Sequence, residues 1–192
     1  GRMLDDIILN DTEIKIISES DVIFVHFWAS CFSQVIELKK TYGFKLAVDF
    51  DVCRDFDVME KFSPFVDFFM ISGSEEYLPQ FKKLSYKYEC LFNISLAERG
   101  SVTYYKGKEF KAKAVKVDTV IDTTGCGDSY HAGFVCSYIL EKDIENVYSV
   151  KFDDLHATFG MTCALAELQI ALPGEIKSSR HLKNVMDRRP FI

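Results

Sequence analysis

The chain has 192 residues, of which 48% are hydrophobic and 27% charged, and this balance predicts a globular core and excludes a disordered chain. The net charge of -6, with basic residues scattered along the sequence, argues against nucleic acid as a partner. No apolar run is long enough to span a bilayer, and residues 1–6 lack the basic-then-apolar order of a signal peptide. We therefore expect a cytoplasmic protein with no membrane partner.

The cysteine pattern points to the same compartment. Six cysteines are spread singly along the chain, without a CxxC pair and without Cys/His spacing typical of zinc. We expect reduced thiols rather than disulfides or a structural metal.

Short apolar or aromatic segments alternate with longer amphipathic ones over the first half of the chain. The expected strands are 22–27, 45–50, 67–71 and 91–95. The expected helices are 32–41, 58–62 and 75–88. Apolar strands between helices are typical of a mostly parallel sheet that is covered on both faces.

The alternation of strands and helices then ends. Residues 101–105 and 109–115 flank a Lys-Gly-Lys turn and predict an antiparallel hairpin at the sheet edge, before a further strand at 117–121. Apolar residues at spacings of three and four then predict helices at 128–140, 147–168 and 178–188. We expect residues 1–192 to form a single α/β domain.

One segment combines features that suit phosphate chemistry. Gly125-Cys126-Gly127-Asp128 lies between an apolar strand and an amphipathic helix. The first turn of a helix has N–H groups without partners and the positive end of the macrodipole, so it stabilises an anion. Glycine lets the backbone approach phosphate closely because no Cβ intervenes. The segment predicts an anion hole, with the hydroxyls of Thr123 and Thr124 beside it.

Asp128 lies at the start of the same helix. A hydroxyl must lose its proton when it attacks phosphorus, and a carboxylate within hydrogen-bond reach can accept that proton. The alternative from these residues alone is that Asp128 is an ordinary N-cap and the glycines form a tight loop.

The longer segment from Asp122 to Asp128, together with Ala132-Gly133-Phe134, resembles the C-terminal signature of the PfkB (ribokinase-like) carbohydrate kinases. That signature reads Asp-Thr-x-Gly-Ala-Gly-Asp and is followed by Ala-Gly-Phe. The resemblance implies that Gly125, Cys126 and Gly127 form the anion hole and that Asp128 is the catalytic base. Cys126 replaces the usual alanine, which leaves its N–H unchanged.

Upstream segments follow in the family's order. The resemblance places Asp51 where the family's Asp-x-Asn-x-x-Arg motif usually has asparagine. It assigns Glu75 to the Asn-x-x-Glu motif, which helps place magnesium and phosphate, although Ser72 replaces the asparagine. Glu75 alternatively has only the role of a first-turn acidic residue.

A third segment resembles the family's nucleotide-side turn, Val-Thr-Leu-Gly-x-x-Gly. Ser95 keeps a hydroxyl, Ala97 replaces the first glycine, and Gly100 keeps the turn. These three residues, with Thr123, Thr124 and Glu75, are therefore the expected cofactor-binding residues, and Glu75 is the expected metal ligand.

The resemblance implies a ribokinase-like three-layer α/β/α fold and a phosphotransferase that uses ATP and Mg²⁺ on a sugar or sugar derivative, and it allows for a monovalent cation. It covers the family's C-terminal two-thirds, because the sugar-binding N-terminal part and the lid have no counterpart in these residues. The residues of the signature, and the Ser-Gly-Ser-Glu segment that ends at Glu75, are similar to those of fructosamine-type members such as fructoselysine kinases. A sheet without its first strands would expose an edge, so a homodimer is also expected.

The sequence leaves two other functions to compare with a kinase. A nucleotide-binding module without catalysis would fit a chain that lacks the sugar-binding region. A Rossmann dehydrogenase needs Gly-x-Gly-x-x-Gly after an early strand, whereas position 130 is tyrosine and the glycines come late. His26 and His131 have no ligand or nucleophile at useful spacing, so packing or surface roles are expected for both.

Overall fold

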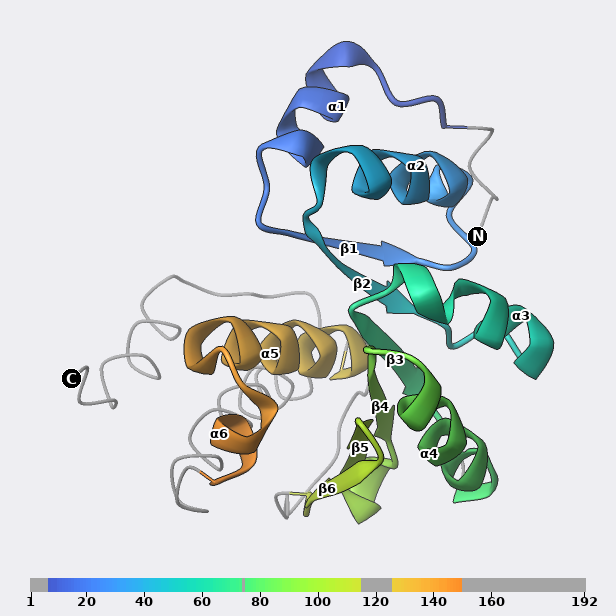
Figure 1. Ribbon diagram of the computed structural model, residues 1–192, viewed down its shortest axis with the longest axis vertical. Coiled ribbons are helices and arrows are strands. Elements are labelled where there is room, and N and C mark those ends of the chain that lie inside the picture. The colour runs from blue at the N-terminus through green and yellow to red at the C-terminus, as the bar shows by residue number, and fades with distance from the viewer. Residues whose placement is uncertain (1–6, 74, 115–125, 150–192) are drawn as a thin grey trace. The chain divides into compact units, whose positions relative to one another are not determined.

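The computed structural model describes residues 7–73, 75–114 and 126–149 (Figure 1). The chain divides into two compact units. Unit 1 comprises Gly1–Leu96 and Val102–Phe110, and unit 2 comprises Ala97–Ser101 and Lys111–Ile192. Among the described residues, no helix is both long and apolar enough to cross a membrane.

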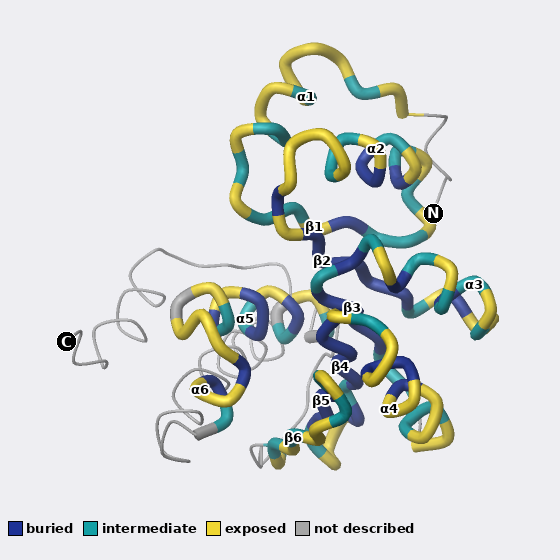
Figure 2. The backbone as a smooth tube through the Cα atoms, in the orientation of Figure 1, coloured by how far each residue is buried: buried dark blue, intermediate teal, exposed yellow. Residues whose placement is uncertain are grey.

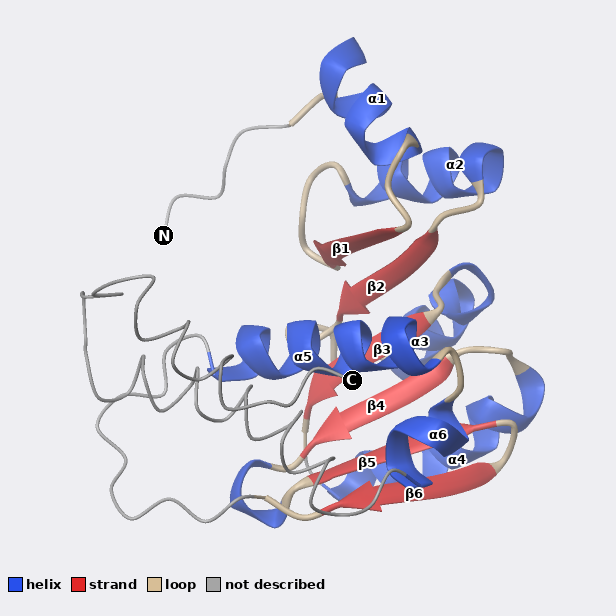
Figure 3. Cartoon of the chain, turned by 90° about the vertical axis from the view of Figure 1, so that its left-hand side faces the viewer, coloured by secondary structure: helices blue, strands red, loops and turns tan. Residues whose placement is uncertain are grey.

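A sheet of six strands in the order β1-β2-β3-β4-β5-β6 is the centre of unit 1. The strands are β1 (Val22–His26), β2 (Lys45–Asp49), β3 (Phe68–Ser72), β4 (Leu91–Ser95), β5 (Ser101–Tyr105) and β6 (Lys108–Ala112). Strands β1 to β4 pair in parallel and run in one direction in Figure 3. Their carboxyl ends therefore meet at one edge of the sheet.

The helices of unit 1 connect these parallel strands. They are α1 (Asp11–Ser18), α2 (Phe32–Tyr42), α3 (Phe56–Phe62) and α4 (Leu78–Lys87), with short 3₁₀ turns η1 (Ser63–Phe65) and η2 (Glu75–Tyr77). The Asp55 carboxylate caps α3 by accepting from the N–H groups of Asp57 and Val58. Gly43 ends α2 with a φ of 74°, a left-handed conformation that favours glycine.

The hydrophobic core of unit 1 lies between one face of the sheet and these helices. Phe69 is at its centre, fully buried, with its ring stacked on Phe50 at a centroid distance of 3.9 Å. Met59 of α3 and Phe81 of α4 are also fully buried in this core. Figure 2 shows the inner strands as buried and the outer surfaces of the helices as exposed. The apolar strands of the sequence thus pack against the apolar faces of the helices that follow them.

A charged cluster fixes the opposite, amino end of the parallel strands. The Asp67 carboxylate accepts hydrogen bonds from Lys39 Nζ, from Lys45 Nζ at 3.0 Å and from Leu46 N at 2.8 Å. Burial alone would raise the pKa of Asp67, but these three hydrogen bonds outweigh it, so that the pKa lies below its ordinary value. The cluster ties α2 to the starts of β2 and β3.

The hairpin β5–β6 has a two-residue turn, Lys106-Gly107, in which both residues have positive φ (49° and 76°). Such turns match the twist of antiparallel strands. The Tyr104 hydroxyl donates to Glu109 Oε2 at 2.7 Å across the hairpin. Burial and this hydrogen bond both raise the pKa of Tyr104, so the phenol stays protonated at neutral pH.

Unit 2 contains the short turn η3 (Ala97–Arg99) and the helices α5 (Cys126–Glu141) and α6 (Ile144–Ser149). Phe134, Ile144 and Val147 are buried, and the Asp143 carboxylate caps α6 by accepting from Glu145 N at 2.9 Å. α6 overlaps the first residues of the helix expected at 147–168. The rest of that helix, the helix expected at 178–188 and the strand expected at 117–121 lie outside the described residues.

Candidate active site

The signature helix is α5, and it begins at Cys126, so the described part of the signature forms its first turn. Gly127 is half-buried and Asp128 is exposed. The free N–H groups and the positive dipole of this turn favour an anion at the position expected from the sequence. Gly125, Thr123 and Thr124 lie outside the described residues, as does the side chain of Cys126.

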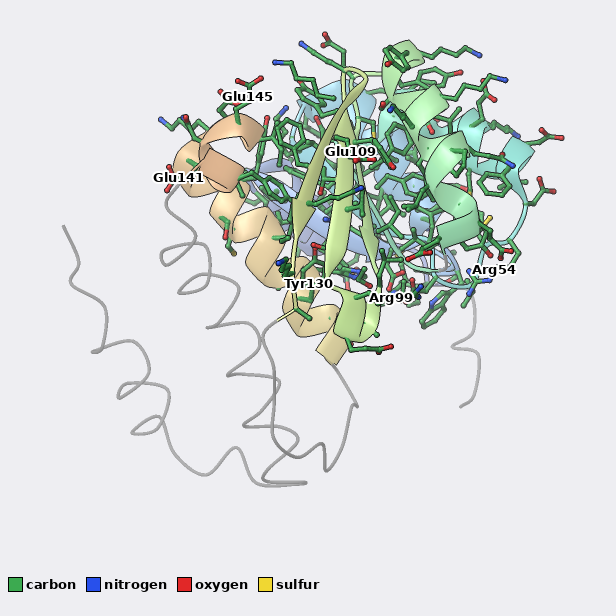
Figure 4. All side chains as sticks on the ribbon, turned by 90° about the horizontal axis from the view of Figure 1, so that it is seen from below. Arg54, Arg99, Glu109, Tyr130, Glu141 and Glu145 are labelled. Atoms are coloured by element: carbon green, nitrogen blue, oxygen red, sulfur yellow. The ribbon has the colours of Figure 1, made fainter. Side chains whose placement is uncertain are left out.

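Residues further along α5 are buried, whereas Asp128 in its first turn is exposed. His131 and Phe134 are fully buried, and the ring of Tyr130 makes an edge contact with that of His131 at a centroid distance of 5.8 Å. Tyr130 is labelled on α5 in Figure 4. The burial of His131 agrees with the packing role expected for it.

The second group of site residues lies in unit 1, at the carboxyl edge of the parallel strands. The paired registers place His26 beside Asp49, and Ser72 beside Ser95, at the last positions of their strands. Ligands of open α/β sheets bind outside the carboxyl ends of the strands. The expected residue Ser95 is thus in the right place for such a role.

Side-chain hydrogen bonds join these strand ends into one chain. Asp49 Oδ2 lies 3.1 Å from His26 Nδ1, while Asp49 Oδ1 accepts from Asp51 N at 2.7 Å. The Asp51 carboxylate accepts in turn from Ser72 N, and the Ser95 hydroxyl donates to the Ser72 hydroxyl at 3.1 Å. We call these five residues the carboxyl-edge chain.

Sequence reasoning missed the partner of His26. The imidazole has Asp49 at hydrogen-bond distance and stacks on the exposed ring of Trp28, with centroids 5.2 Å apart. The sequence offers no signal for this pair, because only the parallel register of β1 and β2 brings it together. His26 thus has an acidic partner in space that its sequence neighbours did not indicate.

Glu75 begins η2, directly after the end of β3, and its carboxylate is exposed. Magnesium prefers oxygen ligands and usually keeps several waters with one or two carboxylates. The exposed Glu75 carboxylate is an oxygen ligand of this kind, so it fits Mg²⁺. Arg54, which ends the loop after β2 and is labelled in Figure 4, is exposed.

Ala97 and Gly100, two residues of the turn expected on the nucleotide side, lie in unit 2. Ala97 has a φ of 52°, in the left-handed region where glycine is usual, so the alanine keeps the backbone conformation at a steric cost. Gly100 has a φ of 91°, and a Cβ there would lie 2.0 Å from Ala112 O. The turn therefore needs glycine at position 100 and tolerates its loss at position 97.

Three comparisons place these features among known proteins. Residues 68–152 match the model of the pfkB family carbohydrate kinases, a segment that includes the signature, Glu75 and the nucleotide-side turn. The chain is 26% identical over 139 residues to fructoselysine 6-kinase from Escherichia coli, covering 71% of this chain and 52% of that protein. It is 42% identical over 52 residues to a nucleoside kinase from Methanocaldococcus jannaschii, covering 27% of this chain and 17% of that protein.

Solved structures have the same fold. The adenosine kinase from Sinorhizobium meliloti superposes with a TM-score of 0.70 at 18% identity, covering 93% of this chain and 57% of the other. A putative ribokinase II from E. coli, in complex with ATP and Mg²⁺, superposes with a TM-score of 0.64 at 13% identity, covering 92% and 61%. The chain thus spans about half the length of the fructoselysine 6-kinase and of the adenosine kinase. The predicted ribokinase-like α/β/α fold and the predicted similarity to PfkB carbohydrate kinases are confirmed.

Proposed function

We propose that this chain provides the nucleotide-binding and catalytic part of an ATP-dependent kinase, which transfers the γ-phosphoryl group to a hydroxyl of a sugar or sugar derivative. The observation that supports it most is the first turn of α5, which contains Gly127 and Asp128 and lies inside the segment that matches the carbohydrate kinases. A dehydrogenase has no support from this arrangement.

In this proposal the backbone N–H groups from Gly125 to Asp128, including that of Cys126, stabilise the charge on the transferred phosphoryl group. Donors aimed at charge that develops in the transition state supply a large part of catalysis in such reactions. Asp128 accepts the proton of the attacking hydroxyl, since its carboxylate is exposed in the same turn. Thr123 and Thr124 add hydroxyl contacts to phosphate oxygens.

ATP and Mg²⁺ are the proposed donor and cofactor. When bound, Mg²⁺ neutralises charge on the phosphate oxygens. We assign Glu75 to hold it, while Ser95, Ala97 and Gly100 line the nucleotide side. The solved structure that contains ATP and Mg²⁺ supports the use of this donor and cofactor by analogy of fold. A monovalent cation is an optional further cofactor.

The acceptor belongs to the same proposal. The relatives named as fructoselysine 6-kinase and nucleoside kinase both act on sugar-containing small molecules by name, and the former covers more of this chain. We favour a fructosamine-type sugar derivative as acceptor. A cytoplasmic location suits both the ATP donor and the free thiols of Cys31, Cys53, Cys90 and Cys136, the cysteines whose side chains are described.

A homodimer is the proposed assembly. Strand β1 comes first in the sheet order and has Phe24 40% exposed on it, and Trp28 just after it is 57% exposed. An edge strand with exposed aromatic residues favours association with another chain. Light scattering at several protein concentrations tests this, and a monomer throughout would contradict it.

The test of the catalytic role is the Asp128→Asn variant, assayed for ATP consumption with Mg²⁺ and a panel of ribose, fructose and fructoselysine. We expect nucleotide affinity to stay nearly unchanged while transfer falls by about two to four powers of ten. The matched control is Asp143→Asn, because Asp143 is also an acidic residue at a helix start in unit 2. It should keep its turnover, and it should keep its stability as well, because asparagine caps a helix about as well as aspartate.

The same assay separates the second candidate, a nucleotide-binding module without catalysis. That module would bind ATP and show no turnover with any acceptor, in the wild type as in the variant. Unchanged turnover in Asp128→Asn would instead identify Asp128 as a first-turn acidic residue, whose charge stabilises the helix by about 0.3–1 kcal/mol.

A further inference from the structure

Asp51 links two loops that follow neighbouring parallel strands. Its carboxylate, in the loop after β2, accepts a hydrogen bond from Ser72 N at the end of β3. The Asp51 backbone is itself held, because its N–H donates to Asp49 Oδ1 at 2.7 Å. A charged acceptor on a backbone N–H is stronger than a neutral one, so this contact fixes the end of β3 effectively.

The backbone that Asp51 fixes leads directly to the proposed magnesium ligand. Ser72 and Gly73 are followed by Ser74 and then by Glu75 at the start of η2. Gly73 N donates to Ser95 O at 3.0 Å, and the Ser72 and Ser95 hydroxyls meet at 3.1 Å. Three hydrogen bonds thus hold Ser72 and Gly73. Ser95 of β4 makes two of them, and Asp51 in the loop after β2 makes the third.

Close packing restricts the same turn from its other side. A Cβ on Gly73 would lie 2.9 Å from Cδ2 of Tyr77, the last residue of η2. Tyr77 in turn packs on Phe81 of α4, with ring centroids 6.2 Å apart. Ser72 and Gly73, which lead to Glu75, are therefore held by hydrogen bonds, and Gly73 is also closely packed.

We propose that Asp51 is a positioning residue that fixes the β3–η2 turn, so that the Glu75 carboxylate is presented to Mg²⁺. This inference rests on the proposed function, because it takes Glu75 as the metal ligand. Groups that orient metal ligands from outside the coordination sphere change metal affinity by about 10- to 100-fold when they are removed. The role requires an acceptor oxygen on residue 51 and not its negative charge.

A conservative substitution can therefore test the role, because it can remove the charge of residue 51 and keep its acceptor oxygen. Asparagine has an acceptor Oδ1 of the same geometry as one aspartate oxygen. It is also the residue that the resembled PfkB motif usually has at this position. Asp51→Asn should therefore keep the hydrogen bond from Ser72 N, whereas Asp51→Ala removes it. Asp55 provides the control, because it also follows β2 and accepts backbone N–H groups, but those of α3.

The experiment uses the 192-residue chain and two readouts. The first is hydrogen exchange of the Ser72 amide, followed by NMR without ligand. The second is the affinity for ATP by calorimetry as Mg²⁺ is varied, in the wild type, Asp51→Ala, Asp51→Asn, Asp55→Ala and Glu75→Gln. In Asp51→Ala we expect exchange of the Ser72 amide to accelerate about tenfold, and the apparent Mg²⁺ affinity to fall about tenfold.

The other variants separate positioning from general destabilisation. Asp51→Asn should stay within about threefold of the wild type in both readouts, and Asp55→Ala should lower Tm while leaving both readouts unchanged. Two results would overturn the positioning role alone. One is that the Ser72 amide stays protected from exchange in Asp51→Ala. The other is that ATP affinity keeps its Mg²⁺ dependence in Asp51→Ala but loses that dependence in Glu75→Gln. Unchanged Mg²⁺ dependence in Glu75→Gln, or no ATP binding by the wild type, would overturn the proposed function, and the inference with it.

Discussion

The Asp67 cluster at the amino end of the sheet gives a stability prediction with a defined pH dependence. Asp67→Asn keeps the shape of the side chain and an acceptor for Leu46 N, but removes the charge that pairs with Lys39 and Lys45. Lys39 is largely buried, with 18% of its side chain exposed, whereas Lys45 is 51% exposed. The loss therefore comes mainly from Lys39.

A hydrogen bond between charged groups away from solvent contributes about 1.5–3 kcal/mol, and an exposed ion pair at most about 1 kcal/mol. Lys39 keeps its hydrogen bond to Phe44 O at 2.9 Å, which reduces the cost. We expect Asp67→Asn to lower the free energy of unfolding by about 2–3 kcal/mol at pH 7. For a chain of this length that corresponds to a Tm lower by about 4–12 °C.

The pKa of Asp67 is lowered in the folded protein, so its contribution is complete above the unfolded value of about 3.9 and is lost as pH falls through the folded value. Urea unfolding at several values between pH 7 and pH 3 should show the difference between wild type and Asp67→Asn shrinking at the acidic end. The control is Glu37→Gln, which breaks an exposed pair with Lys40 and should cost less than about 0.5 kcal/mol. A cost for Asp67→Asn that equals the control, or that is independent of pH, would refute the reasoning.

Three further predictions concern other parts of the molecule. Gly100→Ala should destabilise unit 2 and weaken ATP binding, because the new Cβ would lie 2.0 Å from Ala112 O at a φ of 91°; unchanged calorimetric affinity and Tm would contradict this. Phe69→Ala should cost about 3–5 kcal/mol in chemical unfolding, since the ring is fully buried and stacked on Phe50, and a cost below 1 kcal/mol would be inconsistent with that packing. Cys90 should resist iodoacetamide in the folded protein because burial raises its pKa, and rapid labelling detected by mass spectrometry would argue against the buried site.

Much of the fold follows from the sequence because each parallel strand is a short apolar run with its own helix. The predicted strands 45–50 and 91–95 agree with β2 and β4 to within a residue. Helix α1 was not predicted, although Asn10 and Glu13 have the spacing of a capping box and both capping hydrogen bonds are present. That signal was available in the sequence.

The site is predictable only in part, for a physical reason. The position of Asp128 in the first turn of a helix follows from local sequence, since glycine and aspartate favour such starts. The carboxyl-edge chain does not, because Asp49 meets His26, and Asp51 meets Ser72, only through the registers of paired strands. Contacts between residues distant in sequence depend on tertiary structure, which no spacing rule encodes.

The most direct test of the central claim follows the phosphoryl group itself. The chain is incubated with Mg²⁺, fructoselysine and ATP labelled with ¹⁸O in the γ-phosphoryl group, and the acceptor is analysed by mass spectrometry, in parallel with Asp128→Asn. The account predicts labelled phosphate on the acceptor hydroxyl with the wild type, and a yield lower by about two to four powers of ten with the variant. Labelled product formed equally by both proteins would contradict the role of Asp128 as the catalytic base.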